Sequence, residues 1–417
     1  MTADVTGGAG PPAPPDVPSS PPPHGGGPAR RFGGRATALL FNVRVLRIAG
    51  QVAAIVVLLV LAAYLADNYR ANTADRNSRT GWGFLDEPTG FGIAYAPNFR
   101  PGQPVRDALR VGVVNTAASA LVGIALATVI GVVVGVLRLS NSWVARKAST
   151  LYVEIIRNVP VLLVMIFLAA GLLTLPRIQE ARQIDGLAVI SNRAIAVVSP
   201  VAGDNLGLYL ALVAAGVVAA VALAAWRTRV SNASGAPDRR GLWCGGLLLA
   251  VVVGGYYALG APITWSHPEA EGLGVVGGFS FNIPYVAITV ALAVYHGSHI
   301  AEIVRGSVQA VPHGQTEAAT AIGLSEIQRL RFVVLPQAFR IAVPPTINQY
   351  LSLIKNTSLG IAVAYSDVAS LAFRLVGSSR APALQMVLVL MAIYLTFSLL
   401  TSFFLNILNR RLQLVER

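Results

Sequence analysis

Long apolar stretches separated by polar, arginine-containing loops constrain this chain more than any other feature of its sequence. A helix that crosses the hydrocarbon core of a bilayer needs about 20 mainly apolar residues. Stretches of this kind lie at 48–66, 112–137, 157–175, 206–226, 243–260, 284–304, 341–363 and 383–407. We therefore expect an all-α polytopic membrane protein with about eight transmembrane helices. The seventh stretch is the weakest, because several polar residues and two prolines interrupt it.

The composition excludes the common alternatives to a membrane protein. Hydrophobic residues make up 54% of the chain and charged residues only 12%, whereas a soluble domain carries about 25% charged residues. A disordered chain would need low hydrophobicity and high net charge. The single cysteine, Cys244, excludes an intramolecular disulfide and a metal site built from cysteines.

The basic residues indicate how the chain is oriented. The formal net charge is +13, and the only lysines are Lys147 and Lys355. Arginines are concentrated in alternate loops, which the positive-inside rule places in the cytoplasm. We therefore expect both termini to be cytoplasmic. The positive charge then faces anionic lipid, and no nucleic-acid partner is needed to explain it.

One polar loop, between Arg305 and Arg340, carries a local folding pattern. An Ala-rich run that favours helix ends at Gly323, which permits a sharp turn, and Ser325 can cap a second helix. Leu335-Pro336 is expected to limit that second helix, because the residue before a proline is disfavoured in the helical region. The pattern predicts a helix–turn–helix on the cytoplasmic face, suited to docking in a groove of another protein.

The same loop resembles the signature E-A-A-x(3)-G-x(9)-I-x-L-P of permease subunits of bacterial ABC importers, with Val333 in place of Ile. The matching residues are Glu317, Ala318, Ala319, Gly323, Leu335 and Pro336. The resemblance implies that loop 317–336 couples the permease to a separate cytoplasmic ATPase by sitting in a cleft of that subunit. Segments 152–160, 300–315 and 355–359 are similar to motifs of the polar amino-acid permeases. The long N-terminal extension and the extra central spans look most like a permease of general L-amino-acid uptake systems.

The resemblance implies a domain organisation around a five-helix type I ABC importer permease core. A Pro/Gly-rich disordered tail would occupy 1–47, and the first transmembrane helix with its periplasmic loop would occupy 48–110. The permease domain would span 111–410, followed by a tail at 411–417. Its core would comprise 112–175 and 284–410, and an insertion at 176–283 would add the spans 206–226 and 243–260.

No enzymatic site is expected in this chain. Neither lysine follows a glycine, so the Gly-Lys-Ser/Thr element of a P-loop is missing. The five histidines form no H-E-x-x-H cluster, and no G-x-S-x-G element is present. The implied mechanism is alternating access by a permease without its own cofactor, whose partner subunit binds ATP and Mg. The implied partners are that ABC ATPase, a second permease subunit or a second copy, and a periplasmic amino-acid-binding protein.

Ionisable and polar residues within spans are costly, so they are candidates for function. Three-residue spacing predicts two structural ion pairs, one between Glu154 and Arg157 and one between Glu302 and Arg305. The candidate translocation pathway comprises Lys355, Asn356, Thr357, Ser358 and His299. A break at Lys355 and Asn356 would expose helix ends to an amino acid's carboxylate. For His299, a buried pair with His296 is the alternative interpretation.

Two other classes of protein fit parts of the sequence. An ion-gradient-driven secondary transporter or channel explains the apolar spans, and a scaffold protein explains the tail and topology. A secondary transporter or channel has no need of the 317–336 loop, and a scaffold does not explain the polar residues within the seventh stretch. Both features favour the importer. The sequence does not distinguish which amino acid is carried, whether the permease pair is homodimeric or heterodimeric, or what the inserted spans and the Pro-rich tail do.

Overall fold

A computed structural model describes residues 43–75, 81–96, 98–234 and 240–412, and the chain divides into two compact units, residues 1–79 and 80–417. In the first unit the described element is helix α2 (Val43–Asp75), which is long and apolar enough to cross a membrane between Leu46 and Asn72. It contains the predicted span 48–66. Most of the predicted tail at 1–47 and most of the tail at 411–417 lie outside the described residues.

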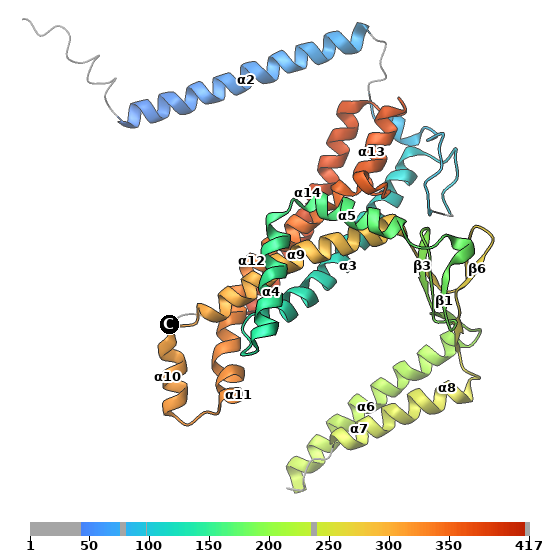
Figure 1. Ribbon diagram of the computed structural model, residues 1–417, viewed down its shortest axis with the longest axis vertical. Helices are drawn as coiled ribbons and strands as arrows, with labels where there is room; N and C mark the ends of the chain where they lie inside the picture. Colours follow the sequence, from blue (N-terminus) through green and yellow to red (C-terminus); the bar gives the residue numbers. More distant parts are fainter. Residues whose placement is uncertain (1–42, 76–80, 97, 235–239, 413–417) are drawn as a thin grey trace, which may run out of the picture. The chain divides into compact units, whose positions relative to one another are not determined.

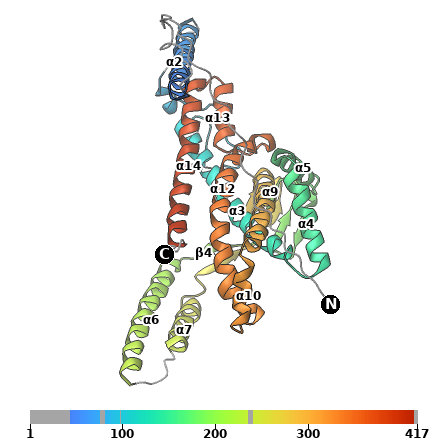
Figure 2. The same ribbon diagram turned by 90° about the vertical axis from the view of Figure 1, so that its left-hand side faces the viewer.

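The second unit is mainly helical (Figures 1 and 2). Its longer helices are α3 (Val105–Leu137), α4 (Trp143–Asn158), α5 (Val161–Leu173), α6 (Leu206–Ser234), α7 (Arg240–Leu249), α9 (Ile283–Gln309), α10 (His313–Ala321), α12 (Leu335–Asn356), α13 (Val368–Gly377) and α14 (Ala383–Leu412). Shorter helical segments are η1 (Gly83–Asp86), η2 (Ile178–Glu180), η3 (Ala250–Gly254), α8 (Gly255–Ala258), α11 (Glu326–Arg329), η4 (Leu330–Val334) and η5 (Thr357–Val363).

By length and composition, six helices in the described part of the chain could cross a membrane, and eight could if each of two bent helix pairs forms one span. The mostly helical, polytopic fold class and the count of about eight spans are thereby confirmed. The spans at 206–226 and 243–260 correspond to α6 and to the run α7–η3–α8.

The third apolar stretch, 157–175, does not form one straight helix. Helices α4 and α5 meet at Val159 and Pro160 with a bend of 108°. Val159 has an extended backbone, as expected for a residue before proline. Helix α5 has 13 residues, or about 20 Å at 1.5 Å per residue, which is too short to cross a bilayer alone.

Helix α9 lies at the centre of the bundle, packed against α3, α4, α5 and α12. Glycines set its close approach to α3. A Cβ atom at Gly131 would lie 2.5 Å from Cβ of Ile300, and one at Gly135 would lie 2.7 Å from Cβ of Val304. Small residues of this kind allow membrane helices to approach closely. The side chains of Leu292 and Leu353 are fully buried in the core between these helices.

The insertion 176–283 contains short strands that the sequence analysis did not predict. Four antiparallel strands form a sheet in the order β1 (Arg182–Ile184), β2 (Ala188–Ile190), β3 (Ala194–Val197) and β8 (Phe279–Asn282). Two further antiparallel pairs join β4 (Ser199–Ala202) to β5 (Ile263–Ser266) and β6 (Glu269–Glu271) to β7 (Gly274–Val276). Strand β8 leads directly into α9, so the sheet is continuous with the central helix.

The two inserted spans form a helical hairpin, with α6 alongside α7 (Figures 1 and 2). A π-helical turn, η3, interrupts the second arm, and the hydroxyl of Tyr209 donates to the carbonyl oxygen of Val252 within it, at 3.1 Å. Cys244 Sγ donates to the carbonyl oxygen of Ala220 at 3.3 Å. The lone cysteine therefore joins the two arms, consistent with a small residue buried in a membrane.

Candidate functional site

Candidate functional residues lie toward both ends of α9. We call the end at Ile283, next to β8, the sheet end, and the end at Gln309, next to α10, the loop end. Between the two ends, the mainly apolar helix carries His296 and His299.

At the loop end, α10 and α11 form a hairpin around Gly323. Gly323 has φ +81°, a left-handed conformation that glycine adopts without the steric cost of a Cβ atom. The hydroxyl of Ser325 accepts a hydrogen bond from the backbone N–H of Gln328, whose side chain accepts one from the N–H of Ser325. This capping box begins α11. The predicted turn and cap are both present.

The predicted end of the second helix at Leu335-Pro336 is wrong. The helical run continues without a break from α11 through the π-helical turn η4 into α12. Proline is tolerated in the first turn of a helix, where its missing N–H is not needed, and Pro336 is the second residue of α12, which follows the π turn. The hairpin is therefore connected to α12 by continuous helix.

The signature residues in the hairpin are mostly exposed. Glu317 and Ala318 face solvent, and the Glu317 carboxylate lies 3.0 Å from Nδ1 of His313. Ala319 is buried, while Leu335 and Pro336 are exposed. Two exposed apolar side chains at the tip, Ile322 and Ile327, were not among the predicted site residues; they are 76% and 78% exposed. The signal was present, because apolar residues flank the turn glycine in an otherwise polar loop.

Glu302, near the loop end of α9, is at the centre of an ion-pair network. Its carboxylate accepts hydrogen bonds from Arg305, as predicted, and from Arg138 directly after α3. The guanidinium of Arg157 lies 3.8 Å from the same carboxylate. The predicted partner of Arg157, Glu154, has an exposed side chain and forms no ion pair within the described residues. One carboxylate therefore joins the ends of three helices, α3, α4 and α9.

The predicted pathway residues divide into two groups. Asn356 Nδ2 lies 3.2 Å from Nε2 of His296, whose Nδ1 lies 3.2 Å from Oε1 of Gln349. Thr357 is buried, and its hydroxyl donates to the carbonyl of Ile354 at 2.7 Å. Asn356 and Thr357 therefore make their hydrogen bonds within this chain.

The remaining pathway candidates behave differently. The Lys355 side chain is exposed, and Ser358 donates to the carbonyl of Lys355 at 2.8 Å. The rings of His299 and His296 lie 6.4 Å apart, and Nε2 of His299 is buried with no hydrogen-bond partner among the described residues. The alternative of a buried histidine pair therefore fits the geometry in part.

The helix break lies further along the chain than predicted. Helical structure continues past Asn356 as the 3-10 helix η5, and the backbone turns at Ala364, which has φ +59°. Helix α3 holds the break: Asn115 Nδ2 donates to the carbonyl of Ser366 at 2.8 Å. In turn, the Val368 N–H donates to Oγ1 of Thr116 at 3.1 Å. The axis bends by 49° between the flanking helices.

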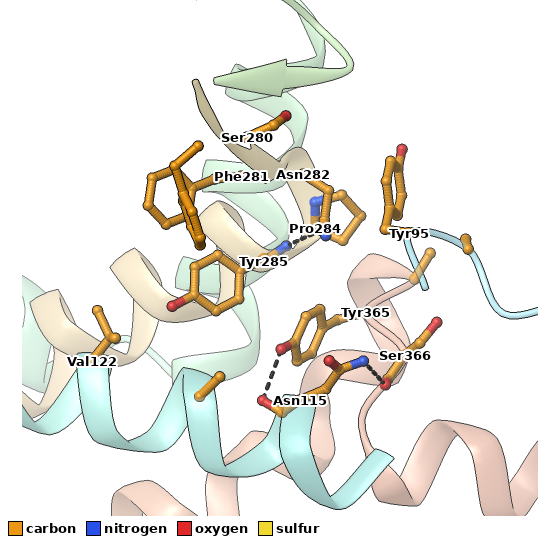
Figure 3. Close-up of a pocket in the computed structure, with 14 residues that line it drawn as sticks. Tyr95, Asn115, Val122, Ser280, Phe281, Asn282, Pro284, Tyr285, Tyr365 and Ser366 are labelled. Atoms are coloured by element: carbon orange, nitrogen blue, oxygen red, sulfur yellow. Dashed lines mark hydrogen bonds between the residues drawn. The ribbon is translucent and has the colours of Figure 1, made fainter. Parts of the chain in front are cut away.

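A cavity of about 380 Å³ lies at the sheet end, beside this break. Figure 3 shows the ring of Tyr285 between those of Phe281 and Tyr365. The residues that line the cavity come from the loop before α3, from α3, β8 and α9, and from the helix break. They are Ala94, Tyr95, Asn115, Ala118, Val122, Phe279, Ser280, Phe281, Asn282, Pro284, Tyr285, Ala364, Tyr365 and Ser366. This cavity was not predicted from the sequence, because its walls come from three segments that are far apart in the sequence, residues 94–122, 279–285 and 364–366.

Comparison with known proteins identifies the class. Residues 242–414 match the family described as the binding-protein-dependent transport system inner membrane component. The chain is 35% identical to the putative amino-acid ABC transporter permease protein YhdX of Escherichia coli, over 88% of this chain and 94% of that protein. It is 37% identical to the general L-amino acid transport system permease protein AapQ of Rhizobium johnstonii, over 88% and 92% of the two chains. The chain therefore belongs to this family of ABC transporter permeases, and the predicted resemblance is confirmed.

Solved structures give a more distant likeness. An amino acid ABC transporter crystallised with histidines aligns with 73% of this chain and 94% of its own, at a TM-score of 0.43 and 16% identity. The methionine ABC transporter MetNI in an inward-facing conformation aligns with 74% of this chain and 98% of its own, at a TM-score of 0.41 and 17% identity.

Proposed function

We propose that this chain is one transmembrane subunit of an ABC importer that carries L-amino acids across the bacterial inner membrane by alternating access. The observation that supports this most strongly is the match to AapQ, a general L-amino acid transport system permease, along nearly the full length of both chains. A third relative, BztB of Rhodobacter capsulatus, is 31% identical over 92% of this chain and is described as a glutamate/glutamine/aspartate/asparagine transport permease. Amino acids are thus the shared substrate class of these relatives.

The α10–α11 hairpin is the proposed docking element for a separate ATPase subunit. Its exposed tip combines Ile322 and Ile327 with the fixed turn at Gly323. Apolar side chains that are surrounded by polar residues favour a protein partner. A short rigid helix with exposed apolar residues can lie in a groove of that partner.

Movement of the hairpin can be transmitted to the membrane-spanning helices, because a continuous helix joins them. From Glu326 to Val363 the chain is helical without interruption, and Gln349 and Asn356 on this run contact His296 of the central helix. A packed helix moves as a rigid element, so nucleotide-driven displacement of the tip would shift α12 against α9. This linkage supports loop 317–336 as the lever between ATP hydrolysis and the transmembrane helices.

The proposed translocation pathway lies along the exposed face of α12. Asn348, Ser352 and Lys355 are exposed on this helix at spacings of four and three residues, so they share one face. Polar side chains at membrane depth are tolerated where they face protein or water rather than lipid. We therefore assign this face to the boundary with a second permease subunit, either a related chain or a second copy. Behind this face, the wall of the pathway would include Asn356, Thr357, Ser358 and His299.

The energy source and the substrate delivery are assigned to other subunits. The proposed ATPase partner binds ATP and Mg, and this permease contributes no cofactor of its own. A periplasmic binding protein would deliver the amino acid at the sheet end of the bundle. The arginine distribution supports the corresponding orientation, with the hairpin and both termini in the cytoplasm.

Co-purification followed by reconstitution tests this function. The chain, tagged at its C-terminus, would be extracted from its native membrane in mild detergent and its partners identified by mass spectrometry. We expect an ABC ATPase and a second permease, and we expect the complex in vesicles to accumulate labelled L-amino acids only with ATP and binding protein. Recovery of a folded chain alone, or uptake that follows an ion gradient without ATP, would contradict the proposal.

A further inference from the structure

The sheet-end cavity has an unusual balance of chemical groups. Five of its 14 lining residues are aromatic, and none is Lys, Arg, His, Asp or Glu. A cavity volume of about 380 Å³ lies within the range of small-molecule sites, roughly 300–1,000 Å³. The cavity is therefore large enough for a small metabolite but provides no charged side chain to bind it.

The aromatic rings form a continuous series along the cavity wall. The rings of Phe281 and Tyr285 are stacked, with centroids 5.7 Å apart and planes at 11°. The centroids of Tyr285 and Tyr365 lie 6.0 Å apart at 48°. Figure 3 shows these rings side by side around the cavity. Ring faces carry negative electrostatic potential and attract cations within about 6 Å of the centroid.

The backbone N–H groups that would bind an anion at the start of α9 are already occupied. Helix α9 begins at the cavity, and a helix N-terminus normally offers free N–H groups to anions. However, the N–H of Ile283 donates to the carbonyl of Arg193 at 3.3 Å, and Pro284 has no N–H. The N–H of Tyr285 donates to Oδ1 of Asn282 at 2.8 Å. The first turn of α9 therefore leaves no free N–H group for a carboxylate.

The other helix end at the cavity has the opposite polarity. The helical run through α12 and η5 ends at Val363, and the next residue, Ala364, lines the cavity. The carboxyl end of a helix carries partial negative charge. Asn115 Nδ2 and the Tyr365 hydroxyl are already engaged as donors, to the carbonyls of Ser366 and of Asn115 respectively. Within the described residues, Oδ1 of Asn115 accepts no hydrogen bond and is free to accept one from a ligand.

We propose that the sheet-end cavity is a binding site for an organic ammonium group, held against the faces of Tyr285, Tyr365 and Phe281 and by hydrogen bonds to uncharged oxygen acceptors. The inference rests on the proposed function in identifying this group with the α-ammonium of an amino acid that enters the permease. It adds to that function a position for the ammonium group, in a cavity whose lining has no cationic side chain to pair with a carboxylate.

Matched small probes test the charge preference without any transport step. The full complex in lipid nanodiscs would be mixed with n-propylammonium, 1-propanol or n-butanoate, which share a three-carbon chain and differ in the charge of the head group. Saturation-transfer NMR would measure transfer from protein aromatic protons to each probe. We expect transfer to n-propylammonium, displaced by an L-amino acid, and much weaker transfer to the other two probes.

Graded fluorination tests the aromatic contribution. Tyr285→Phe keeps the ring face, and stepwise fluorination of the phenylalanine at this position withdraws electron density while leaving the ring apolar. We expect Tyr285→Phe to retain propylammonium binding and the trifluorinated ring to weaken it about tenfold. The same series at Tyr257, an exposed ring on the inserted hairpin, is the control and should leave binding unchanged.

The outcomes separate this inference from the proposed function. Equal transfer to n-propylammonium and n-butanoate would overturn the ammonium site. Binding that is insensitive to fluorination at position 285 would also overturn it. Both results are obtained without ATP, so they would leave amino-acid import untouched. Conversely, failure of ATP-dependent uptake by the wild-type complex would overturn the proposed function and not the cation preference of the cavity.

Discussion

Glu302 on α9 accepts a hydrogen bond from Arg138, the residue that follows the last turn of α3, and so joins the loop ends of two helices that are in close contact along most of their length. The side chain of Arg138 is 10% exposed and that of Glu302 is 26% exposed. Arg305 and Arg157 surround the same carboxylate. The one negative charge of Glu302 therefore offsets part of the positive charge of three arginines.

Replacing Glu302 with glutamine should destabilise the loop end of the bundle. Glu302→Gln removes the negative charge and leaves three guanidinium groups close together, at a cost of about 2 kcal/mol after allowance for partial exposure. We expect a lower midpoint of thermal unfolding in detergent, measured by fluorescence-detected size exclusion. The control Glu154→Gln should leave the midpoint unchanged, because Glu154 is exposed. Equal midpoints for both variants would show that the network contributes nothing to stability.

Thr116 should be required to hold the helix break in place. It is fully buried, and its hydroxyl accepts the N–H of Val368 at the start of α13. Thr116→Val keeps the shape but leaves this N–H unsatisfied, which costs about 1–3 kcal/mol. We expect reduced thermal stability and reduced uptake for Thr116→Val.

The matched control for this prediction is Thr116→Ser. It retains the hydroxyl and loses one methyl group, so it should stay closer to wild type than the valine variant in both measurements. If serine proved more damaging than valine, packing rather than the hydrogen bond would be the contribution of Thr116.

Local features of the fold could be predicted from the sequence because their causes are local. Gly323 and Ser325 determine a turn and a cap through the conformations of only a few residues. Glu302 and Arg305 pair because they lie one turn apart on the same helix. The same rule was wrong for Arg157, since its ion pair is with Glu302 of another helix and not with Glu154.

Features that depend on distant segments could not be predicted. The cavity brings Asn115 together with Ser366, 251 residues further along the chain. The spacing of apolar and polar residues in the sequence does not indicate a contact of this kind. The strands of the insertion have three or four residues each, which is too short for a clear alternation of polar and apolar positions. The break after Lys355 was placed too early, because a 3-10 helix continues the backbone where polar residues had indicated an end.

The turn at Gly323 should be required for coupling rather than for folding. Nothing lies within 4 Å of a Cβ atom built at Gly323, so the cost of a side chain comes from the positive φ alone. That cost is roughly 1–2 kcal/mol. Gly323→Val should reach the membrane in normal amounts but lose ATP-dependent uptake, while ATP hydrolysis by the complex no longer responds to substrate.

Gly314 provides the matched control for this change. It lies in α10 of the same hairpin with nothing within 4 Å of a built Cβ atom, and its backbone is helical. Gly314→Val should therefore retain more uptake than Gly323→Val. Normal uptake by the Gly323 variant would remove the turn from the coupling mechanism.

The exposed tip of the hairpin should determine the affinity for the ATPase. Ile322 and Ile327 contribute little to the stability of the isolated chain, because they are largely exposed, and surface substitutions usually change stability by less than about 0.5 kcal/mol. Burying two such side chains in a partner contributes about 1.5–3 kcal/mol each. The double variant Ile322→Ser, Ile327→Ser should unfold at the wild-type temperature and bind the ATPase at least tenfold more weakly, as measured by titration in nanodiscs. Leu273→Ser, which changes a 64% exposed residue in the β6–β7 turn, should bind it normally, and equal affinities for the two variants would place the docking surface elsewhere.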